Sequence, residues 1–374
     1  MPELVVLDIA PGPAYVEAIW RVWGNGDAFM PLDSRLPSAE RNRVLMALAP
    51  TKSMDSDGRV TNVAGGRPVE AGDALVIATS GTTGFPKGVV HTHNSIAASA
   101  RATSAALRID PAHDRWLACL PLAHIGGLSV VLRSVITDTP VTIHNGFDAK
   151  NVEESALRGG VTRLSLVTKA LAQVNPALFK TVLLGGAAPP QDRAANCIAT
   201  YGMTETGSGV VYEGWPLDGV ELRVDADEQI WVRGPMLLRT YRSALSDNDP
   251  KDGDGWFPTG DLGFFHLDGR IGVSGRAGDV IVTGGEKVWP TRVEQIISAM
   301  EGVDEVCVVG RSHSDWGQQV TAVVVPSVGM TPPPLDTIRA VVKESLPAWY
   351  APQVIELVEV LPKTESGKIQ RHLV

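Results

Sequence analysis

The sequence lacks the features that mark secreted, metal-cluster and membrane-spanning proteins. It contains only three cysteines, Cys119, Cys197 and Cys307, which are widely spaced and form no CxxC pair. This usage is typical of a reducing cytoplasm and argues against a metal cluster, so each cysteine is expected to be a small core residue. The N-terminus has no basic segment followed by a long apolar run, so neither a signal peptide nor a transmembrane helix is expected.

Positive charge is also scarce. Lys and Arg number 33 against 42 for Asp and Glu, which gives a net charge of −9. This balance argues against nucleic acid or an anionic membrane as a partner, and an anionic substrate would have to be held by local donors. The 374 residues, 44% hydrophobic and 20% charged, suffice for two domains of a soluble globular protein. The sequence leaves the oligomeric state open, a homodimer included.

The most informative stretch is TSGTTGFPKG, residues 79–88. The apolar run 74–78 predicts a buried strand before it, and residues 94–107 predict a helix after it. Glycines let backbone N–H groups turn inward, hydroxyls add donors and Lys87 adds a compact charge, which together suit a polyphosphate. The Walker A spacing is absent, and an ordinary flexible turn is the alternative interpretation. The candidate phosphate-binding residues are Thr79, Ser80, Gly81, Thr82, Thr83, Gly84 and Lys87.

The order of the predicted elements indicates an α/β fold. Strands and helices alternate from residue 116 to 184, which predicts a mostly parallel sheet with helices on its faces. Residues 51–73 are polar and Gly-rich, and a surface loop is expected there. Short strands follow from residue 219, and a compact α+β pattern begins after Arg276. We therefore expect a large N-terminal domain, residues 1–276, and a small C-terminal domain, residues 277–374.

Three more motifs of the large domain carry chemistry. His124, in PLAHIGG, follows a predicted strand, where α/β sheets place ligands, although it could simply cap the next helix. Gly185, Gly186 and Ala187 are small enough to let a flat ring approach the backbone. In TYGMTET, residues 200–206, Tyr201 offers an aromatic face, Thr204 a hydroxyl and Glu205 a hard oxygen ligand for Mg²⁺.

Further candidates lie toward the C-terminus. Asp261, in TGD, could accept from both hydroxyls of a ribose, and Arg276 could donate to the sugar and to phosphate. Each of these two alone is more often a member of a surface ion pair. The motif GGEKVWP, residues 284–290, precedes a predicted helix, and PKTESGKIQR, residues 362–371, places Lys368 beside a glycine near the end of the chain.

In their order and in their residues, these motifs resemble those of the adenylate-forming superfamily, which includes acyl-CoA synthetases, carrier-protein adenylation domains and beetle luciferases. The resemblance covers about residues 74–374. It implies a large α/β domain and a mobile C-terminal lid. It also implies that the protein uses ATP, Mg²⁺ and coenzyme A, the last as a co-substrate. It implies an ATP site formed by the phosphate loop with Gly185, Gly186, Ala187, Tyr201, Gly202, Met203, Asp261 and Arg276. It implies a coenzyme A site at Gly285, Glu286 and Lys287. It also implies that Glu205 is a metal ligand and that His124, Thr204, Glu205 and Lys368 are catalytic.

Within the superfamily, residues 121–127, 133–136 and 200–220 are most similar to o-succinylbenzoate–CoA ligases of menaquinone biosynthesis. A dianionic aromatic acid would need a second cation, for which His124 and Arg133 are candidates. Gly278 stands where the superfamily commonly has Asp or Lys, at the pivot of the lid. Two other classes remain open: an adenylating enzyme that loads a carrier protein, and a nucleotide-binding regulator without turnover.

Overall fold

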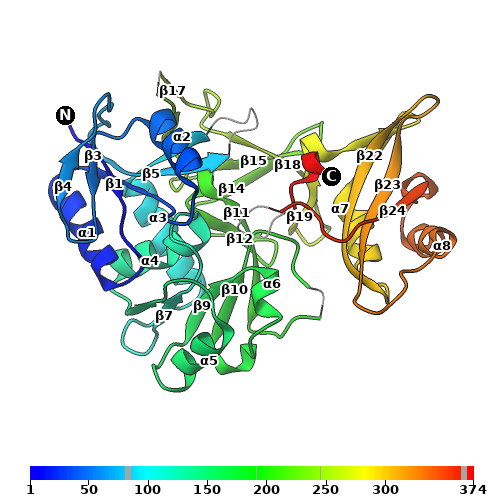
Figure 1. Cartoon of the computed structure of the whole chain (residues 1–374), viewed down its shortest axis with the longest axis horizontal. Helices are drawn as coiled ribbons and strands as arrows, with labels where there is room; N and C mark the ends of the chain where they lie inside the picture. Colours follow the sequence, from blue (N-terminus) through cyan, green and yellow to red (C-terminus); the bar gives the residue numbers. More distant parts are fainter. Residues whose placement is uncertain (81–85, 191, 245, 364–368) are drawn as a thin grey trace. The chain divides into compact units, whose positions relative to one another are not determined.

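The computed structural model describes residues 1–80, 86–190, 192–244, 246–363 and 369–374 (Figure 1). The chain divides into two compact units. Unit 1 comprises Met1–Leu222 and Val232–Phe257, and unit 2 comprises Arg223–Trp231 and Pro258–Val374. The border predicted from the sequence pattern, close to residue 277, stays a prediction. Among the described residues, no helix has the length and apolar character needed to cross a membrane.

The first sheet of unit 1 has eight strands in the order β17-β16-β6-β5-β2-β1-β3-β4. Strands β1, β2, β3 and β5 run parallel, and the other four are antiparallel to their neighbours. The central strands β1 and β2 are buried along their whole length, as expected where both faces of a sheet are covered. The strands are β1 (Leu4–Leu7), β2 (Ala28–Pro31), β3 (Lys52–Met54), β4 (Val60–Asn62), β5 (Asp73–Ser80), β6 (Pro86–Thr92), β16 (Thr240–Arg242) and β17 (Asp247–Asn248).

The second sheet of unit 1 has seven strands in the order β13-β12-β11-β10-β9-β7-β8. The five strands from β11 to β8 are parallel, and β12 and β13 extend the sheet in antiparallel fashion. The predicted α/β fold class is confirmed, although the strands form two mixed sheets instead of one. The strands are β7 (Trp116–Ala118), β8 (Val141–Ile143), β9 (Arg163–Leu166), β10 (Thr181–Leu184), β11 (Cys197–Met203), β12 (Ser208–Tyr212) and β13 (Trp215–Pro216).

Two helices of unit 1, α3 and α4, lie side by side (Figure 1). Helix α3 begins with a capping box, in which the hydroxyl of Thr92 accepts from the amide of Ser95 and the hydroxyl of Ser95 accepts from the amide of Thr92. Helix α2 ends at Leu48, and the buried Arg242 donates to the carbonyl of Leu48 and thereby satisfies this helix end. The helices are α1 (Pro13–Gly24), α2 (Ser38–Leu48), α3 (His93–Ala106), α4 (Ile125–Thr137), α5 (Ala149–Leu157) and α6 (Thr168–Leu171).

A four-stranded sheet, in the order β14-β15-β18-β19, begins unit 2. Its strands are β14 (Glu221–Val224), β15 (Gln229–Arg233), β18 (Phe257–Phe265) and β19 (Ile271–Arg276). The border between the units passes through the first three of them. Strands β18 and β19 form an antiparallel hairpin, and Asp268 and Gly269 lie in its turn.

The rest of unit 2 is an α+β module, as predicted. Strands β22 and β23 form a long antiparallel hairpin, and β24 pairs in parallel with β23. Helices α7 and α8 each bury one stripe, Val293 and Ile297 in the first and Ile338 and Val342 in the second, at the four-residue spacing of a helix face. The elements are β20 (Ile281–Thr283), β21 (Glu286–Val288), α7 (Pro290–Ile297), β22 (Val303–His313), β23 (Gly317–Pro326), α8 (Leu335–Ser345) and β24 (Val354–Leu357).

One local prediction was wrong, and one strand was not predicted. Residues 51–73 contain the hairpin of β3 and β4 instead of a plain loop, and the hairpin turns at Gly58, whose φ of 73° suits glycine. The predicted helix over residues 94–107 is confirmed as α3, but strand β6, which was not predicted, lies between it and β5. The pairing of β6 with β5 buries Val89 and Val90, and this tertiary contact outweighs the turn-like composition of the segment.

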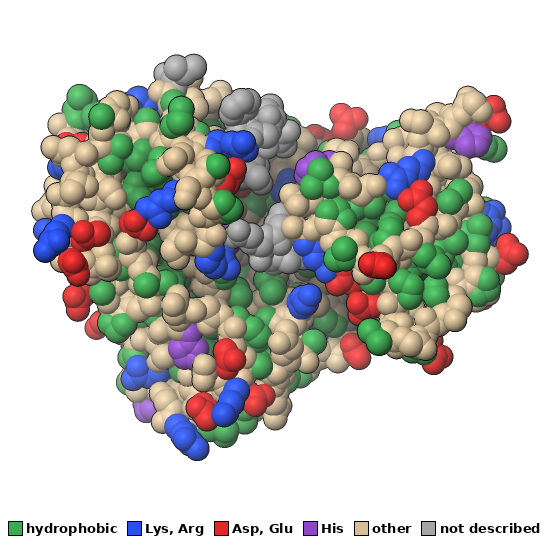
Figure 2. All heavy atoms as spheres, viewed as in Figure 1, with side chains coloured by type: hydrophobic (Ala, Val, Ile, Leu, Met, Phe, Trp, Pro, Cys, Tyr) green, Lys and Arg blue, Asp and Glu red, His purple; other side chains and the backbone are tan. Residues whose placement is uncertain are grey.

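The surface carries mixed charge. On the face that Figure 2 shows, Lys and Arg side chains are interspersed with Asp and Glu. Several charged side chains of the chain pair, for example Arg41 with Asp8 and Arg233 with Glu221. Exposed pairs of this kind contribute at most about 1 kcal/mol each. On this face the charges form no single basic field, in agreement with an anionic ligand being held by a few local donors.

Candidate functional site

The strands on either side of the phosphate loop pair with each other. Thr79 of β5 lies opposite Lys87 of β6, and its hydroxyl donates to the Lys87 carbonyl over 3.3 Å. A Cβ at the next residue, Gly88, would lie only 2.7 Å from the side chain of Val76, so this position requires glycine. The loop therefore connects two antiparallel strands. Ser80 ends β5, whereas Gly81, Thr82, Thr83 and Gly84 lie outside the described residues, so their role in phosphate binding stays a prediction.

Lys87 and Glu205, which lie more than one hundred residues apart in the chain, come together in unit 1. The ammonium of Lys87 is 3.8 Å from Glu205 Oε1, and the hydroxyl of Tyr241 donates to the same carboxylate oxygen over 2.7 Å. The Lys87 ammonium also lies 3.6 Å from the centre of the Tyr241 ring, a cation–π contact. The Glu205 side chain is only 13% exposed. The predicted phosphate cation and the predicted metal ligand thus share one cluster, which we call the Lys87–Glu205–Tyr241 cluster.

Tyr241 is a site residue that sequence analysis missed. It belongs to β16, which pairs antiparallel with β6 so that Tyr241 lies opposite Val89. Residues two apart on a strand share a face, and diagonal neighbours across a strand pair are within reach of an aromatic ring. The register therefore carries the Tyr241 ring to Lys87. No sequence pattern around Tyr241 predicts this pairing, because β16 follows β6 by about 150 residues in the chain.

His91 is a second missed residue, and it holds the turn that carries Thr204 and Glu205. Its imidazole is fully buried, and Nε2 lies 2.7 Å from the carbonyl oxygen of Thr204, while Nδ1 lies 3.2 Å from Ser95 Oγ. Burial lowers the pKa of His91. The neutral ring must donate from Nε2, since a carbonyl only accepts, which leaves Nδ1 as the acceptor. His91 thus ties the 3₁₀ turn Thr204–Thr206 to the phosphate-loop strand.

The predicted adenine contacts also meet. Leu184, the last residue of β10, pairs with Ala199 of β11, and Thr200 Oγ1 donates to the Leu184 carbonyl over 2.9 Å. A Cβ at Gly185 would lie 3.1 Å from Thr200 Oγ1, so the two motifs are in direct contact. The ends of β10 and β11 therefore place Gly185, Gly186 and Ala187 next to the segment with Tyr201, Gly202 and Met203.

His124 lies at the start of α4, where it is the N-terminal capping residue but makes no capping hydrogen bond through its side chain. The simple helix-cap interpretation is therefore not supported. The hydrogen bond from Arg35 is the largest cause that lowers the pKa of Asp33, and the charge of His124 contributes to this lowering. His124 thus lies close to an acidic group of unit 1.

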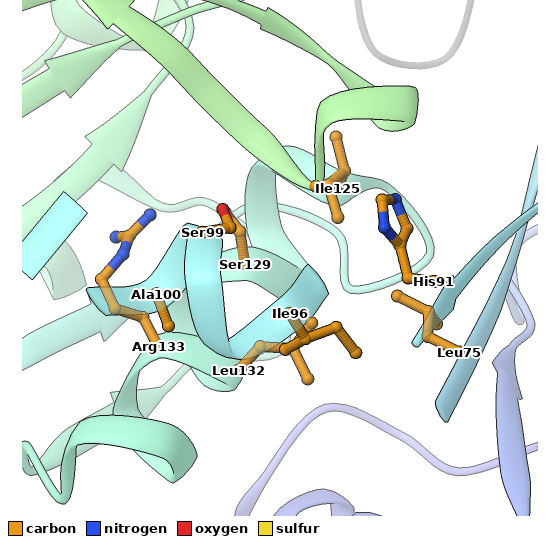
Figure 3. Close-up of a pocket in the computed structure, with 10 residues that line it drawn as sticks. Leu75, His91, Ile96, Ser99, Ala100, Ile125, Ser129, Leu132 and Arg133 are labelled. Atoms are coloured by element: carbon orange, nitrogen blue, oxygen red, sulfur yellow. The ribbon is translucent and has the colours of Figure 1, made fainter. Parts of the chain in front are cut away.

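A small cavity lies between β5, β6, α3 and α4. Its volume is about 10 Å³, roughly the space of one water molecule. In Figure 3, His91 and Arg133 lie on opposite sides of it, with Ser99 and Ser129 between them. His91 is the residue that holds Thr204, so the cavity adjoins the predicted site. The lining residues are Leu75, His91, Ile96, Ser99, Ala100, Ile125, Ser129, Leu132, Arg133 and Gly207.

Arg133 is a buried wall residue of this cavity. Its guanidinium lies 4.6 Å from the ring centre of Trp116, and Nη2 donates to Ser208 Oγ over 3.4 Å. Its Nε and Nη1 atoms have no hydrogen-bond partner among the described residues, and burial lowers the pKa of the side chain. A cavity of this size does not admit an aromatic acid. Of the two predicted second cations, His124 is the one outside the core.

In unit 2, the predicted ribose-binding pair is assembled. Asp261 of β18 lies directly opposite Arg276 of β19, and Arg276 Nε is 3.0 Å from Asp261 Oδ1. Arg276 Nη1 also donates to the carbonyl of Thr259 over 2.9 Å. The arginine side chain is 45% exposed, and the aspartate side chain 10%. The pair is thus fixed on one side and open to solvent on the other.

The two remaining predicted sites also belong to unit 2. Gly284 and Gly285 both have positive φ and form the two-residue turn between β20 and β21, which leaves Glu286 and Lys287 exposed at the start of β21. Lys368 lies outside the described residues, so its catalytic role stays a prediction. The residues that flank it, Lys363 and Ile369, form an antiparallel bridge with each other.

A large α/β unit followed by an α+β module, with Lys87 of the glycine-rich motif beside the carboxylate of Glu205, is the arrangement of an adenylate-forming enzyme. Sequence models agree: one for the AMP-binding enzyme family matches residues 40–242, and one for the AMP-binding enzyme C-terminal domain matches residues 292–368. The chain belongs to the AMP-binding enzyme family.

Named relatives cover most of the chain. A protein from Mycobacterium tuberculosis, named "probable 2-succinylbenzoate–CoA ligase", is 39% identical over 334 residues, 82% of this chain and 85% of its own length. A 2-succinylbenzoate–CoA ligase from Listeria monocytogenes is 34% identical over 326 residues, 80% of this chain and 69% of its own length.

Solved structures are also similar to this chain over nearly its whole length. The o-succinylbenzoate coenzyme A synthetase from Bacillus subtilis, in complex with ATP and magnesium ion, superimposes with a TM-score of 0.85 at 28% identity, covering 99% of this chain and 88% of that one. The ATP-bound MatB from Rhodopseudomonas palustris, at 23% identity and a TM-score of 0.86, shares the fold and covers 100% of this chain and 88% of its own.

Proposed function

We propose that this chain is a 2-succinylbenzoate–CoA ligase of menaquinone biosynthesis. In the first step, a carboxylate of the acid attacks the α-phosphorus of ATP and pyrophosphate leaves. In the second step, the thiol of coenzyme A attacks the acyl carbon, loses its proton, and AMP leaves. The similarity to ligases of this name over four fifths of the chain supports the substrate and the acceptor. The Lys87–Glu205–Tyr241 cluster is the single observation of the structure that carries the ATP-dependent step.

The cluster fits a magnesium–ATP complex. In nucleotide sites Mg²⁺ is commonly bound through one or two protein carboxylates, with substrate phosphates and water completing the shell. Glu205 offers one such carboxylate, and among the described residues no group of three or more His, Cys, Asp and Glu forms a dedicated cage. A magnesium ion at Glu205 would neutralise phosphate charge. Lys87, beside it, would hold the departing pyrophosphate.

The other residues would bind and orient the substrates. Asp261 would accept from the ribose hydroxyls while Arg276, paired with it, donates to the sugar. The backbone at Gly185–Ala187 and the ring of Tyr201 would hold the adenine. Because carboxylate and α-phosphate are both anions, a cation must bridge them in the transition state, and we assign this role to Lys368.

The cysteines also indicate the cellular compartment of the protein. All three cysteines are buried and unpaired, which supports a reducing compartment. We propose a cytoplasmic enzyme with a small-molecule acid as its substrate.

Measurement of AMP release separates the candidate functions. We expect ATP- and coenzyme A-dependent turnover that is faster with o-succinylbenzoate than with benzoate or octanoate. Faster turnover with octanoate would contradict the proposed substrate. Release of pyrophosphate without release of AMP, unchanged by coenzyme A, would point to a carrier-protein acceptor, and no release of pyrophosphate with any acid would point to a regulator.

Lys368→Ala tests the assignment of the lysine. Removal of one preorganised charge donor costs about 3–4 kcal/mol, roughly a hundred- to thousandfold in rate. We expect this loss in adenylate formation from acid and ATP. Thioester formation from supplied acyl adenylate and coenzyme A should stay near the wild-type rate, because the two anions are already joined. An equal loss in both half-reactions would contradict the assignment.

A further inference from the structure

The chain that follows Lys368 is fixed to the body of unit 2 by one arginine. Arg371 Nη1 and Nη2 donate to the two carboxylate oxygens of Glu294, over 2.5 and 3.1 Å, in a bidentate pair. Arg371 Nε lies 3.3 Å from Asp279 Oδ2. Nη1 also donates to the carbonyl of Val308 and lies 3.4 Å from the sulfur of Cys307. One side chain therefore contacts helix α7, strand β22 and the 3₁₀ turn Ala277–Asp279.

These contacts are not those of a surface ion pair. The side chains of Arg371 and Glu294 are only 21% and 16% exposed. Burial lowers the pKa of Arg371, but the hydrogen bond and charge of Glu294 outweigh it and raise the pKa above its usual value. Glu294 Oε1 also accepts from the amide of Val308 over 2.7 Å, so the acceptor is itself fixed. Bidentate, partly buried arginine–carboxylate pairs are the strong and geometrically specific ones.

The other side of the same segment is fixed as well. Lys363 pairs with Glu305 of β22, and the amide of Gln370 donates to the carbonyl of Pro362 over 2.8 Å. Leu361 is buried against Cys307 and Val309, and Ile369 packs on the same cluster. Both ends of the segment with Lys368 are therefore attached to β22.

We infer that Arg371 is a positioning residue for the lysine three residues before it, and that it couples this lysine to the turn at the proposed pivot. Asp279 directly follows Gly278, so an Arg371–Asp279 contact ties the C-terminal chain to the lid side of the pivot. When the lid rotates, the chain from Ile369 onward has to move with the turn to which Arg371 holds it. This inference rests on the proposed function, because Lys368 matters for adenylation only if the chain forms an adenylate.

The test compares the two half-reactions in Arg371→Ala. A displacement of about 1 Å in a catalytic group can cost about a hundredfold in rate. We expect adenylate formation to fall about a hundredfold, while thioester formation from supplied acyl adenylate stays within about threefold of wild type. Arg371→Lys, which keeps the charge but not the fork that spans Glu294 and Asp279, should fall between Arg371→Ala and wild type.

Arg311 offers the matched control. It makes a bidentate pair with Glu356, on β22 and β24 of the same unit, and has no hydrogen bond or ion pair with the described part of the C-terminal segment. Arg311→Ala should leave both half-reactions unchanged. The double variant Lys368→Ala/Arg371→Ala should be no slower in adenylation than Lys368→Ala alone, because residues that act through one group are not additive. Equal losses in both half-reactions, or losses that multiply in the double variant, would overturn the inference.

A readout without turnover separates the inference from the proposed function. Amide hydrogen exchange of the peptide from Val360 to Val374 reports the bridge and turns that Arg371 secures. In Arg371→Ala we expect faster exchange there, with unchanged protection in β22 and α7. Unchanged exchange of the C-terminal peptide would overturn the anchor even if wild type forms no adenylate. Faster exchange together with an inactive wild type would support the anchor and reject the proposed function alone.

Discussion

The hydroxyl of Tyr241 offers the sharpest test of the proposed magnesium–ATP site. It donates to Glu205 Oε1 over 2.7 Å, while its ring lies over Lys87. Tyr241→Phe removes the hydroxyl but keeps the ring, so it isolates this hydrogen bond. A hydrogen bond to a charged group contributes about 1.5–3 kcal/mol, which corresponds to about 10- to 150-fold in an equilibrium constant. Glu205 is 13% exposed, so water can replace part of the interaction, and we expect the lower end of this range.

The assay measures pyrophosphate release as a function of Mg²⁺ concentration at saturating acid. We expect the half-saturating concentration of Mg²⁺ to rise about tenfold in Tyr241→Phe. Tyr15→Phe is the matched control, because the buried hydroxyl of Tyr15 has no hydrogen-bond partner among the described residues. That variant should leave the Mg²⁺ dependence unchanged. A Tyr241→Phe enzyme whose Mg²⁺ dependence matches that of wild type would refute the assignment of Glu205 as a metal ligand oriented by Tyr241.

Two further predictions concern the sugar and the acid stability of unit 1. Asp261→Ala should weaken ATP binding by about 1.5–3 kcal/mol in calorimetry, whereas Asp268→Ala, in the exposed Asp268–Arg270 pair of the same hairpin, should not; equal affinities would refute the ribose assignment. Burial would raise the pKa of Asp114, but hydrogen bonds from Arg163, the Asp110 amide, Lys180 and Thr162 outweigh it and lower the pKa well below its usual value. The stability from this carboxylate is therefore present above about pH 4 and lost as the pH falls further. Asp114→Asn should cost about 3 kcal/mol at pH 7 in urea unfolding, because it leaves Arg163 buried without its counter-charge, and should show a smaller acid dependence than wild type; parallel pH profiles would contradict this account.

The parts of the molecule that sequence predicted well are those set by local patterns. The apolar run 74–78 lies within the buried strand β5, and the helix predicted over residues 94–107 is α3. The motifs around Glu205 and Asp261 were predicted from their chemistry and from the resemblance. The structure brings each of them to the residue with which the family pattern associates it, Glu205 to Lys87 and Asp261 to Arg276.

What sequence could not predict depends on strand register. Strand β6 carries Lys87, Val89 and His91 on one face at a spacing of two, and only the pairing with β16 decides which distant side chain joins them. That pairing brings Tyr241 to Lys87. Because β6 is buried inside unit 1, His91 also reaches the Thr204 carbonyl. A slip by one residue would turn Tyr241 to the opposite face and leave the Glu205 carboxylate without its donor. The precision of the proposed metal site is therefore set by an edge of the sheet far from the recognised motifs.

The same reasoning explains why unit 2 holds its functional residues differently. Asp261 and Arg276 are direct neighbours across a tight hairpin, so a local sequence pattern suffices to place them. Arg371 instead relies on Glu294 and Asp279, which are 77 and 92 residues away in the chain. Long-range anchors cost more chain entropy to form than hairpin contacts do, and they persist only where several contacts act on one side chain. Arg371 meets this condition with a bidentate carboxylate, a second carboxylate and a backbone carbonyl. Among the described residues, Arg311 of β22 is paired with Glu356 alone. Because several contacts converge on Arg371, we expect the loss of its side chain to impair the function of Lys368. The loss of the Arg311 side chain should not do so.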